Sequence, residues 1–317
     1  MRWIALVALA LCACSPQPAA TGSPAAPSAW SCRLPVVSGS RGQGAGPQTP
    51  GFLNLPANTF TPAGGTGNGM FYDRPLKRWV PWGPPALSAD GATYAYVDGD
   101  NTSSRVHVVD VTTGADVVLA TGGPWRLVGL QPDGVYVMSV KYLPYSEAYG
   151  VLAVGQGLWK VPLQGAPTQL THDDGRNWSF IGGGAAWGDG SGYNIAGKPN
   201  DVVRFDLRTG ELTTWFDHGT RAWVLGVDTG GAPLIFSDLS DEEIWRVPAA
   251  GAGTEIWSGA SGGARPYGPV AFDGGTVWFS SDSLTPGWQI YRYTAAHGME
   301  LAAAFTDHPV TVAGPCA

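Results

Sequence analysis

A short β-strand that ends in a polar or proline turn and a glycine occurs five times between Arg105 and Gly298. The copies are Arg105–Gly114, Gly157–Gly165, Asp201–Gly210, Glu243–Gly251 and Gln289–Gly298. Their turn residues, Asp110, Pro162, Asp206, Pro248 and Thr294, lie 52, 44, 42 and 46 residues apart. Such a period, roughly 40–50 residues, is that of one four-stranded propeller blade. The repeat therefore predicts a circular array of small sheets.

A second element keeps the same period, which makes a chance match improbable. A glycine-containing turn precedes each of five apolar runs: Thr93–Val97, Val135–Met138, Ala185–Trp187, Pro233–Phe236 and Val277–Phe279. Short β-branched and aromatic runs bounded by turn residues are typical of strands, and apolar residues at helical spacing are almost missing. We therefore predict an all-β fold, a six-bladed β-propeller.

Two segments resemble the repeat of TolB-type propellers, a WD40-like repeat. Ser88-Ala-Asp-Gly-Ala-Thr-Tyr-Ala-Tyr-Val97 and Gln131-Pro-Asp-Gly-Val-Tyr136 are similar to the family's turn and apolar strand, and Arg105–Gly114 resembles the strand that follows. The resemblance covers roughly residues 70–300, although later repeats replace Asp-Gly by Gly-Gly. It implies the fold and says little about function, because such propellers serve as partner platforms and as enzyme covers alike.

The number of blades depends on the ends of the chain. We expect Gly51–Leu55, Met70–Asp73, Lys77–Val80 and Val310–Val312 to form a closing sixth blade of mixed N- and C-terminal strands. Seven blades is the alternative, because Cys32–Val37 would then count separately. In either case residues 31–317 make one domain.

The N-terminus predicts export. An apolar run, Trp3–Leu11, follows Met1-Arg2 and is too short to span a bilayer. Ala13-Cys14 resembles a bacterial lipobox, so residues 1–13 are expected to be a lipoprotein signal peptide and Cys14 the lipidated residue. Residues 14–30 form a flexible Ser/Pro/Ala tether. The alternative is an ordinary secretory signal. Both place the protein outside the cytoplasm, and the first places it in the cell envelope.

Two further cysteines, Cys32 and Cys316, flank the predicted ring. Closing a propeller brings its first and last blades together, and disulfides persist in exported proteins. We therefore predict a Cys32–Cys316 disulfide; two free thiols are the alternative.

Charge narrows the choice of partners. The chain has 18 basic and 25 acidic residues, a formal net charge of −7, and no run of lysine or arginine. A nucleic-acid ligand requires a basic stripe, so we expect none. The lipid anchor is the expected membrane contact, and we expect a monomer.

Aromatic residues open the strand expected to be innermost in five blades. They are Trp82, Trp125, Trp178, Trp223 and Tyr267. Such rings at one rim suit stacking on a sugar, an aromatic ligand or a peptide. The alternative is that the rings act as wedges between neighbouring blades. The hypothesis of a ligand-binding rim rests on these five residues.

Acidic residues recur after the second strand of several blades. They are Asp98, Asp100, Asp189, Asp238, Asp241, Glu242, Glu243 and Asp282. His172, His218 and His308 end outer strands, far from the expected axis. An acidic rim attracts a cation or a basic protein patch, but turn capping accounts for an Asp after a strand. We predict no metal and no cofactor.

Catalytic motifs lack their structural context. Gly259–Gly263 matches G-x-S-x-G, but no helix follows it to form a nucleophile elbow. The sequence therefore favours a non-catalytic platform that binds a protein, peptide or glycan in the cell envelope. The alternative is a metal-dependent lactonase or hydrolase, which needs three or more carboxylate or histidine side chains to converge at the channel.

Overall fold

A computed structural model describes most of the chain after Ala29. The described residues are 30–39, 48–63, 71–81, 83, 86–146, 150–172, 175–190, 200–219, 221–237, 242–259, 265–266, 270–281, 287–306 and 309–317. Ser31–Ala317 forms one compact unit, and the description below concerns that unit. Within these ranges we find no helix with the length and apolar character needed to cross a membrane. Cys14, the predicted signal peptide and nearly all of the predicted tether lie outside the described residues.

The described residues form antiparallel sheets built mainly from consecutive strands. Four sheets have four strands each in chain order. The first contains β9 (Trp125–Gln131), β10 (Gly134–Ser146), β11 (Gly150–Val161) and β12 (Thr168–Gln169). The second contains β13 (Asn177–Gly182), β14 (Ala185–Asp189), β15 (Val202–Asp206) and β16 (Leu212–Phe216). The third contains β17 (Ala222–Val227), β18 (Pro233–Ser237), β19 (Glu243–Ala249) and β20 (Ala252–Ser258), and the fourth β21 (Val270–Asp273), β22 (Thr276–Ser280), β23 (Trp288–Thr294) and β24 (Gly298–Phe305).

Three further sheets come from the N-terminal part of the unit. A three-stranded sheet contains β6 (Thr93–Gly99), β7 (Ser104–Asp110) and β8 (Asp116–Gly122), and Leu87 bridges to Tyr94 at its edge. A two-stranded sheet contains β4 (Phe71–Asp73) and β5 (Arg78–Val80). The last sheet combines strands from both ends of the unit, and we call it the mixed sheet although all its pairings are antiparallel. Its order is β25-β1-β2-β3, made of β25 (Val310–Val312), β1 (Cys32–Ser38), β2 (Thr49–Leu55) and β3 (Thr59–Pro62).

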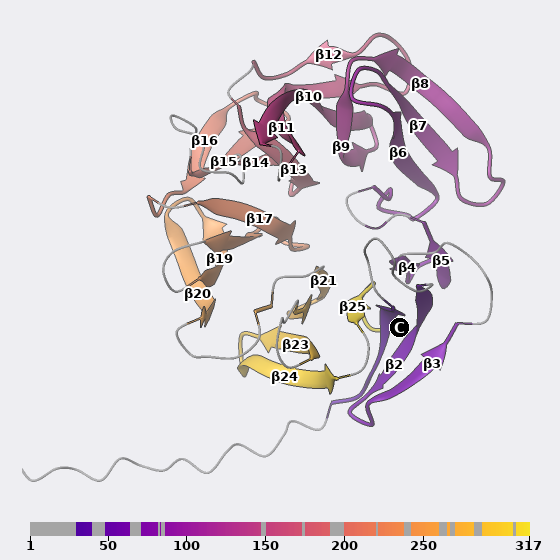
Figure 1. The fold of residues 1–317 in the computed structure, drawn as a ribbon, viewed down its shortest axis with the longest axis vertical. Helices are drawn as coiled ribbons and strands as arrows, with labels where there is room; N and C mark the ends of the chain where they lie inside the picture. Colours follow the sequence, from indigo (N-terminus) through magenta and orange to yellow (C-terminus); the bar gives the residue numbers. More distant parts are fainter. Residues whose placement is uncertain are drawn as a thin grey trace, which may run out of the picture. The chain divides into compact units, whose positions relative to one another are not determined.

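The sheets follow one another around a centre (Figure 1). Apolar clusters lie between neighbouring sheets. Val106 of β7 packs with Val137 of β10, and Met138 of β10 packs with Trp178 of β13. Further round, Ile235 joins a cluster with Trp187, and Phe236 joins one with Phe279. Because a strand alternates its side chains between two faces, the first sheet supplies Val137 to one cluster and Met138 to the next. The third sheet supplies Ile235 and Phe236 to two clusters in the same way.

Two of the five repeated turns share one structure. The Asp110 carboxylate accepts hydrogen bonds from the main-chain N–H groups of Thr112 and Thr113, and Gly114 follows at φ 72°. Asp206 accepts from the next residues in the same way, and Gly210 follows at φ 74°. These backbone hydrogen bonds stabilise the charged form and lower the pKa of Asp206 to about 2. A positive φ favours glycine, which explains the residue that ends the repeat.

The mixed sheet closes the ring with strands from both ends of the unit, as predicted. Val36 pairs with Val312 across β1 and β25, and Val37 pairs with Thr311. Its composition differs from our expectation: β1 takes part, whereas the two segments that begin near Phe71 and Arg78 form the separate β4–β5 hairpin. That hairpin packs by its aromatic residues on the mixed sheet.

The packing is an aromatic group of three rings. Phe52 of β2 lies 5.0 Å from Tyr72 and 5.8 Å from Trp79, measured between ring centroids. Edge-to-face contacts of this kind stabilise a pair beyond the burial of its area.

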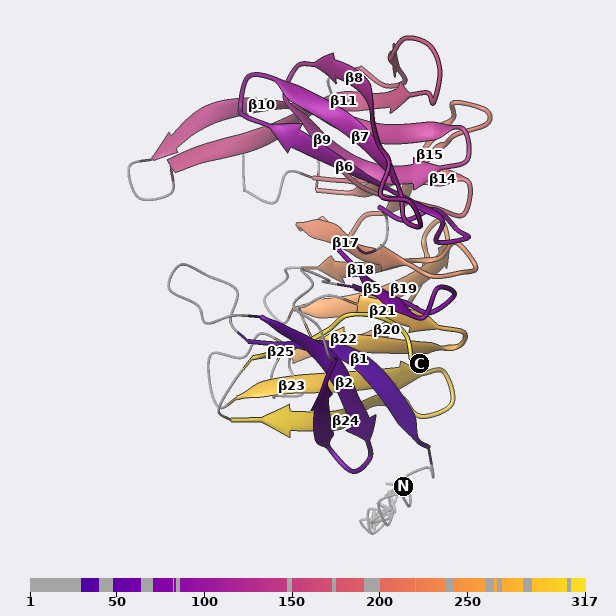
Figure 2. The ribbon, with the colours of Figure 1, turned by 90° about the vertical axis from the view of Figure 1, so that its right-hand side faces the viewer.

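The first sheet contains the longest hairpin described. Its strands β10 and β11 have 13 and 12 residues, and the hairpin reaches past the neighbouring strands (Figure 2).

Candidate ligand-binding site

A cavity of about 550 Å³ lies where separate parts of the ring converge. Phe180 of β13, Leu225 of β17 and Val270 of β21 line it, although they belong to three different sheets. Its other walls come from Phe71–Pro75, from Leu87–Ala89 and from Pro315. The volume is within the range of small-ligand sites, which is roughly 300–1,000 Å³. The ring fold therefore creates the cavity from segments that are distant in the sequence.

The walls of the cavity are mainly apolar and aromatic. Phe71, Phe180 and Phe272 are half-buried and line the cavity, as do the aliphatic Leu225 and Val270. Phe272, Leu225 and Val270 also pack against the apolar cluster between the third and fourth sheets. This packing fixes the walls, so the cavity exists before any ligand binds.

Most polar groups at the cavity already have partners. The Asp228 carboxylate accepts hydrogen bonds from the N–H groups of Gly230 and Ala232, both at 2.9 Å, and forms an ion pair with Arg246 at 2.6 Å. The Ser88 hydroxyl donates to Asp90 at 2.6 Å and accepts from the Thr93 N–H at 2.9 Å. These groups shape the cavity rather than offer free hydrogen bonds to a ligand.

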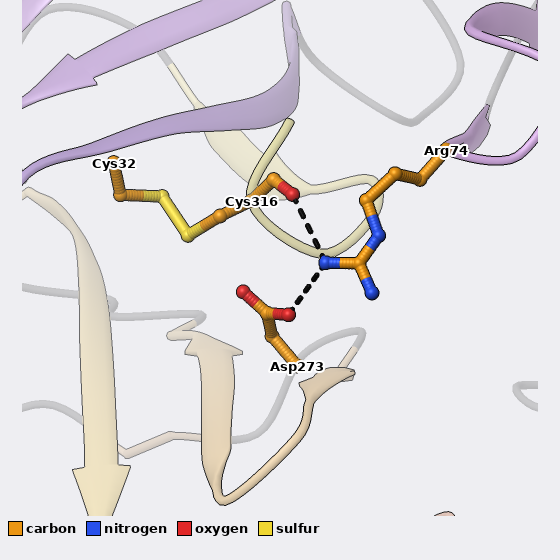
Figure 3. The surroundings of a disulfide bond; sticks show 4 residues. All are labelled: Cys32, Arg74, Asp273 and Cys316. Atoms are coloured by element: carbon orange, nitrogen blue, oxygen red, sulfur yellow. Dashed lines mark hydrogen bonds and ion pairs between the residues drawn. A yellow bond between two sulfur atoms is a disulfide. The ribbon is translucent and has the colours of Figure 1, made fainter.

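Arg74 connects the cavity to the closure of the ring (Figure 3). Its Nη1 donates to Asp273 Oδ1 at 2.6 Å and to the carbonyl oxygen of Cys316 at 3.3 Å. Cys316 forms a disulfide with Cys32, and their Cα atoms are 5.5 Å apart. The predicted disulfide is thereby confirmed. It holds the C-terminal segment that contributes Pro315 to the cavity wall.

Asp73 differs from Arg74 and Asp228, the other charged residues that line the cavity, because it has no ion-pair partner among the described residues. It is the last residue of β4, lines the cavity and is 5% exposed. One of its oxygens accepts a hydrogen bond from the Leu76 N–H at 2.7 Å. In the described part of the chain no basic side chain forms an ion pair with it.

The described residues of the predicted aromatic rim, Trp125, Trp178 and Trp223, lie outside the cavity. Trp178 is 2% exposed and fills the space between two sheets, with Phe205 at 6.1 Å between ring centroids. Trp223 is half-buried and lies 4.6 Å from Phe236, and Trp125 is half-buried against the cluster of the first sheet. Trp82 and Tyr267 lie outside the described residues.

None of these three described rings lines the cavity. Trp223 is near the start of β17, whereas Leu225–Val227 at its other end reach the cavity. Trp125, Trp178 and Trp223 do lie at or near the starts of β9, β13 and β17. Sequence reasoning missed Phe180 and Phe272. Their only sequence signal is an aromatic residue inside an inner strand, which packing alone also produces. A ligand-binding role for the rim stays a prediction.

Asp189 is the most buried carboxylate among those predicted from sequence. Its side chain accepts hydrogen bonds from Ser179 Oγ at 3.0 Å and from the Val224 N–H at 3.2 Å, and so links three strands. Burial raises the pKa of Asp189 to about 7, against the opposing effect of these hydrogen bonds. This carboxylate joins two sheets through hydrogen bonds.

The other acidic and histidine residues of the sequence analysis are dispersed. Asp98 pairs with Arg105, and Asp100 caps the turn at Thr102. His218 stacks on Phe216, and His172 is exposed. Glu242 pairs with Arg265, and the Glu243 carboxylate accepts a hydrogen bond from Trp245. Asp238, Asp241, Asp282 and His308 lie outside the described residues. Among the residues that the structure describes, no three His, Cys, Asp or Glu side chains gather to hold a metal ion.

One polar group was not anticipated. His107 lies between two carboxylates: its Nδ1 is 2.9 Å from Asp116 and its Nε2 is 3.3 Å from Asp98. Its ring stacks on Tyr96 at 4.4 Å between centroids. The Asp116 carboxylate accepts a hydrogen bond from the Tyr96 hydroxyl, and this bond raises the pKa of Tyr96 to about 12. The residues come from β6, β7 and β8, so the network joins the strands of one sheet.

Comparison with known proteins shows the fold. No family model matches the chain, and no curated protein matches it. Among solved structures it is similar to TolB from Acinetobacter baumannii, with a TM-score of 0.54 at 13% identity over 89% of this chain and 67% of TolB. The fold is a β-propeller. At this identity the likeness to TolB carries no further conclusion.

Two enzymes among the solved structures are less similar. Acylaminoacyl peptidase from Pyrococcus horikoshii has a TM-score of 0.49 at 11% identity, and the match covers 88% of this chain and 47% of the peptidase. Oligogalacturonate lyase from Vibrio parahaemolyticus has a TM-score of 0.46 at 14% identity, covering 80% of this chain and 71% of the lyase. The match therefore spans less than half of the peptidase.

Proposed function

We propose that this chain is an exported, lipid-anchored β-propeller that binds a peptide segment of a partner in its central cavity, without catalysis. The supporting observation is the cavity itself, which combines apolar walls from three sheets with polar groups most of which are already paired. The Cys32–Cys316 disulfide fits a protein that works outside the cytoplasm.

Among the ligands considered from sequence, the cavity favours a peptide over a glycan. A glycan presents many hydroxyl groups, and each needs a hydrogen-bond partner once it is removed from water. Ser88 and Asp228 are already engaged within the protein. An apolar side chain, in contrast, needs only the surface that Phe180, Leu225 and Phe272 provide.

The test is a peptide and glycan array probed with the protein and two variants. Thr229 is exposed and lines the cavity, so Thr229→Trp places a large ring at its opening. Thr254 is exposed on β20 and does not line the cavity, so Thr254→Trp is the matched control. We expect peptide binding that Thr229→Trp abolishes and Thr254→Trp leaves intact. Glycan binding unaffected by Thr229→Trp would contradict the proposal.

The aromatic rim is tested separately by the double variant Trp125→Ala/Trp223→Ala. Both rings are half-buried, and neither lines the cavity. Loss of binding in this variant, with normal binding by Thr229→Trp, would move the ligand from the cavity to the rim.

The proposed anchor depends on Cys14. We expect radiolabelled fatty acid to be incorporated into the protein, and Cys14→Ser to abolish the incorporation. Cys12→Ser is the matched control, because Leu11 before it does not fit a lipobox. Unchanged labelling of Cys14→Ser would mean that another residue carries the lipid, and no labelling of the wild type would leave a protein without this anchor.

A further inference from the structure

Asp73 lines the cavity, and its carboxylate is buried. The residue is 5% exposed, and the Leu76 N–H donates to one oxygen at 2.7 Å. The other oxygen lies over Gly91, where an added Cβ would be 2.6 Å away. Gly91 also has φ 70°, so a glycine both adopts this turn and leaves room for the carboxylate. Within the described ranges this second oxygen accepts no hydrogen bond.

The other charges at the cavity are neutralised by partners. Arg74 pairs with Asp273 at 2.6 Å, and Asp228 pairs with Arg246 at 2.6 Å. Arg78 lies opposite Asp73 in the β4–β5 ladder, but its guanidinium donates to the Val111 carbonyl oxygen. Of the charged residues that line the cavity, Asp73 is thus the one without an ion-pair partner among the described residues. A buried carboxylate is stable when a cation or hydrogen-bond donors surround it, and a ligand can supply such a cation.

We propose that the cavity recognises a protonated amine beside an aromatic side chain in the bound peptide, with the amine on Asp73. This inference rests on the proposed function. The aromatic group packs against Phe180 and Phe272, while the ammonium donates to the free oxygen of Asp73. A cation close to phenylalanine rings gains further from their negative faces. The amine is a lysine side chain or a peptide N-terminus.

Four short peptides separate these contributions. Ac-Phe-Lys-NH2 carries the side-chain amine, and Ac-Phe-Nle-NH2 has the same chain without it. Ac-Phe-Glu-NH2 carries a negative charge. Phe-Nle-NH2 with a free N-terminus carries the alternative amine. Binding to the full-length protein is measured by calorimetry at pH 7. We expect one of the two amines to bind at least ten-fold tighter than the neutral peptide, as a hydrogen bond to a charged group implies, and the acid to bind most weakly.

Two variants assign the effect to Asp73. Asp73→Asn keeps an oxygen for the Leu76 N–H but removes the charge, so we expect the amine and neutral peptides to bind alike. Glu255→Gln removes an exposed charge that does not line the cavity, so it should preserve the ten-fold difference. Thermal unfolding of both variants checks that they fold.

Each outcome has a separate meaning. Equal binding of all four peptides, blocked by Thr229→Trp, would overturn the role of Asp73 and leave the proposed function standing. A preference for the amine that persists in Asp73→Asn would also overturn it. If none of the four binds and Thr229→Trp does not change the array, the proposed function fails together with this inference.

Discussion

Removing the disulfide should weaken the fold by an amount that the structure allows to be estimated. Cys32 and Cys316 are 284 residues apart, so the bond closes a very long loop in the unfolded chain. The chain-entropy model then gives about 5.6 kcal/mol at 25 °C. In the folded ring the two residues are adjacent in any case, because β1 pairs with β25. We therefore expect Cys32→Ser/Cys316→Ser to lower the free energy of unfolding by about that amount.

The assay is equilibrium unfolding in guanidinium chloride, with and without dithiothreitol. Wild type in dithiothreitol should match the double variant, and the reductant should leave the variant unchanged. A difference below about 1 kcal/mol between oxidised and reduced wild type would refute the reasoning. It would mean that the unfolded chain already keeps its ends together, so that the bond restricts little.

Three further predictions concern the interior. Because burial raises the pKa of Asp189 to about 7, whereas an unfolded Asp titrates near 4, the folded state binds the proton more tightly. Stability relative to Asp189→Asn should therefore fall by about 4 kcal/mol as the pH rises from about 4 to 7, and parallel urea midpoints across that range would contradict this. A Cβ at Gly155 would overlap the carbonyl oxygen of the residue before β13, whereas one at Gly123 meets nothing. Gly155→Ala should thus lower the thermal midpoint by several degrees and Gly123→Ala should not. Trp178→Ala should reduce the free energy of unfolding by roughly 3–5 kcal/mol, and a loss below about 1 kcal/mol in denaturant melts would show that its ring is not a packing wedge.

The turns and the ring closure were predictable because their signals are local or follow from topology. Asp110 and Gly114 determine a turn within five residues, and Asp206 and Gly210 repeat it. The disulfide followed from the rule that a propeller joins its ends. Both predictions needed only the period of the repeat and the position of two cysteines.

The cavity was not predictable, because it depends on which residues face the centre. Phe180 and Phe272 look like core residues in sequence, and Asp73 looks like the last residue of an ordinary strand of the closing blade. The β4–β5 hairpin shows the same limit: Tyr72 and Trp79 read as strand residues of the closing sheet, but they pack against Phe52 from a separate hairpin. Pairing between strands depends on contacts that a periodic pattern does not specify.

The pairing of β1 with β25 has a consequence for how the protein is made. The apolar residues Leu34, Val36 and Val37 of β1 leave the ribosome early, but the strand that completes their sheet is synthesised more than 270 residues later. During synthesis, an open edge of β1 therefore persists until the intervening strands have been made. Unpaired edges of this kind attract other chains, so the unfinished chain carries a site for mispairing that the finished ring covers.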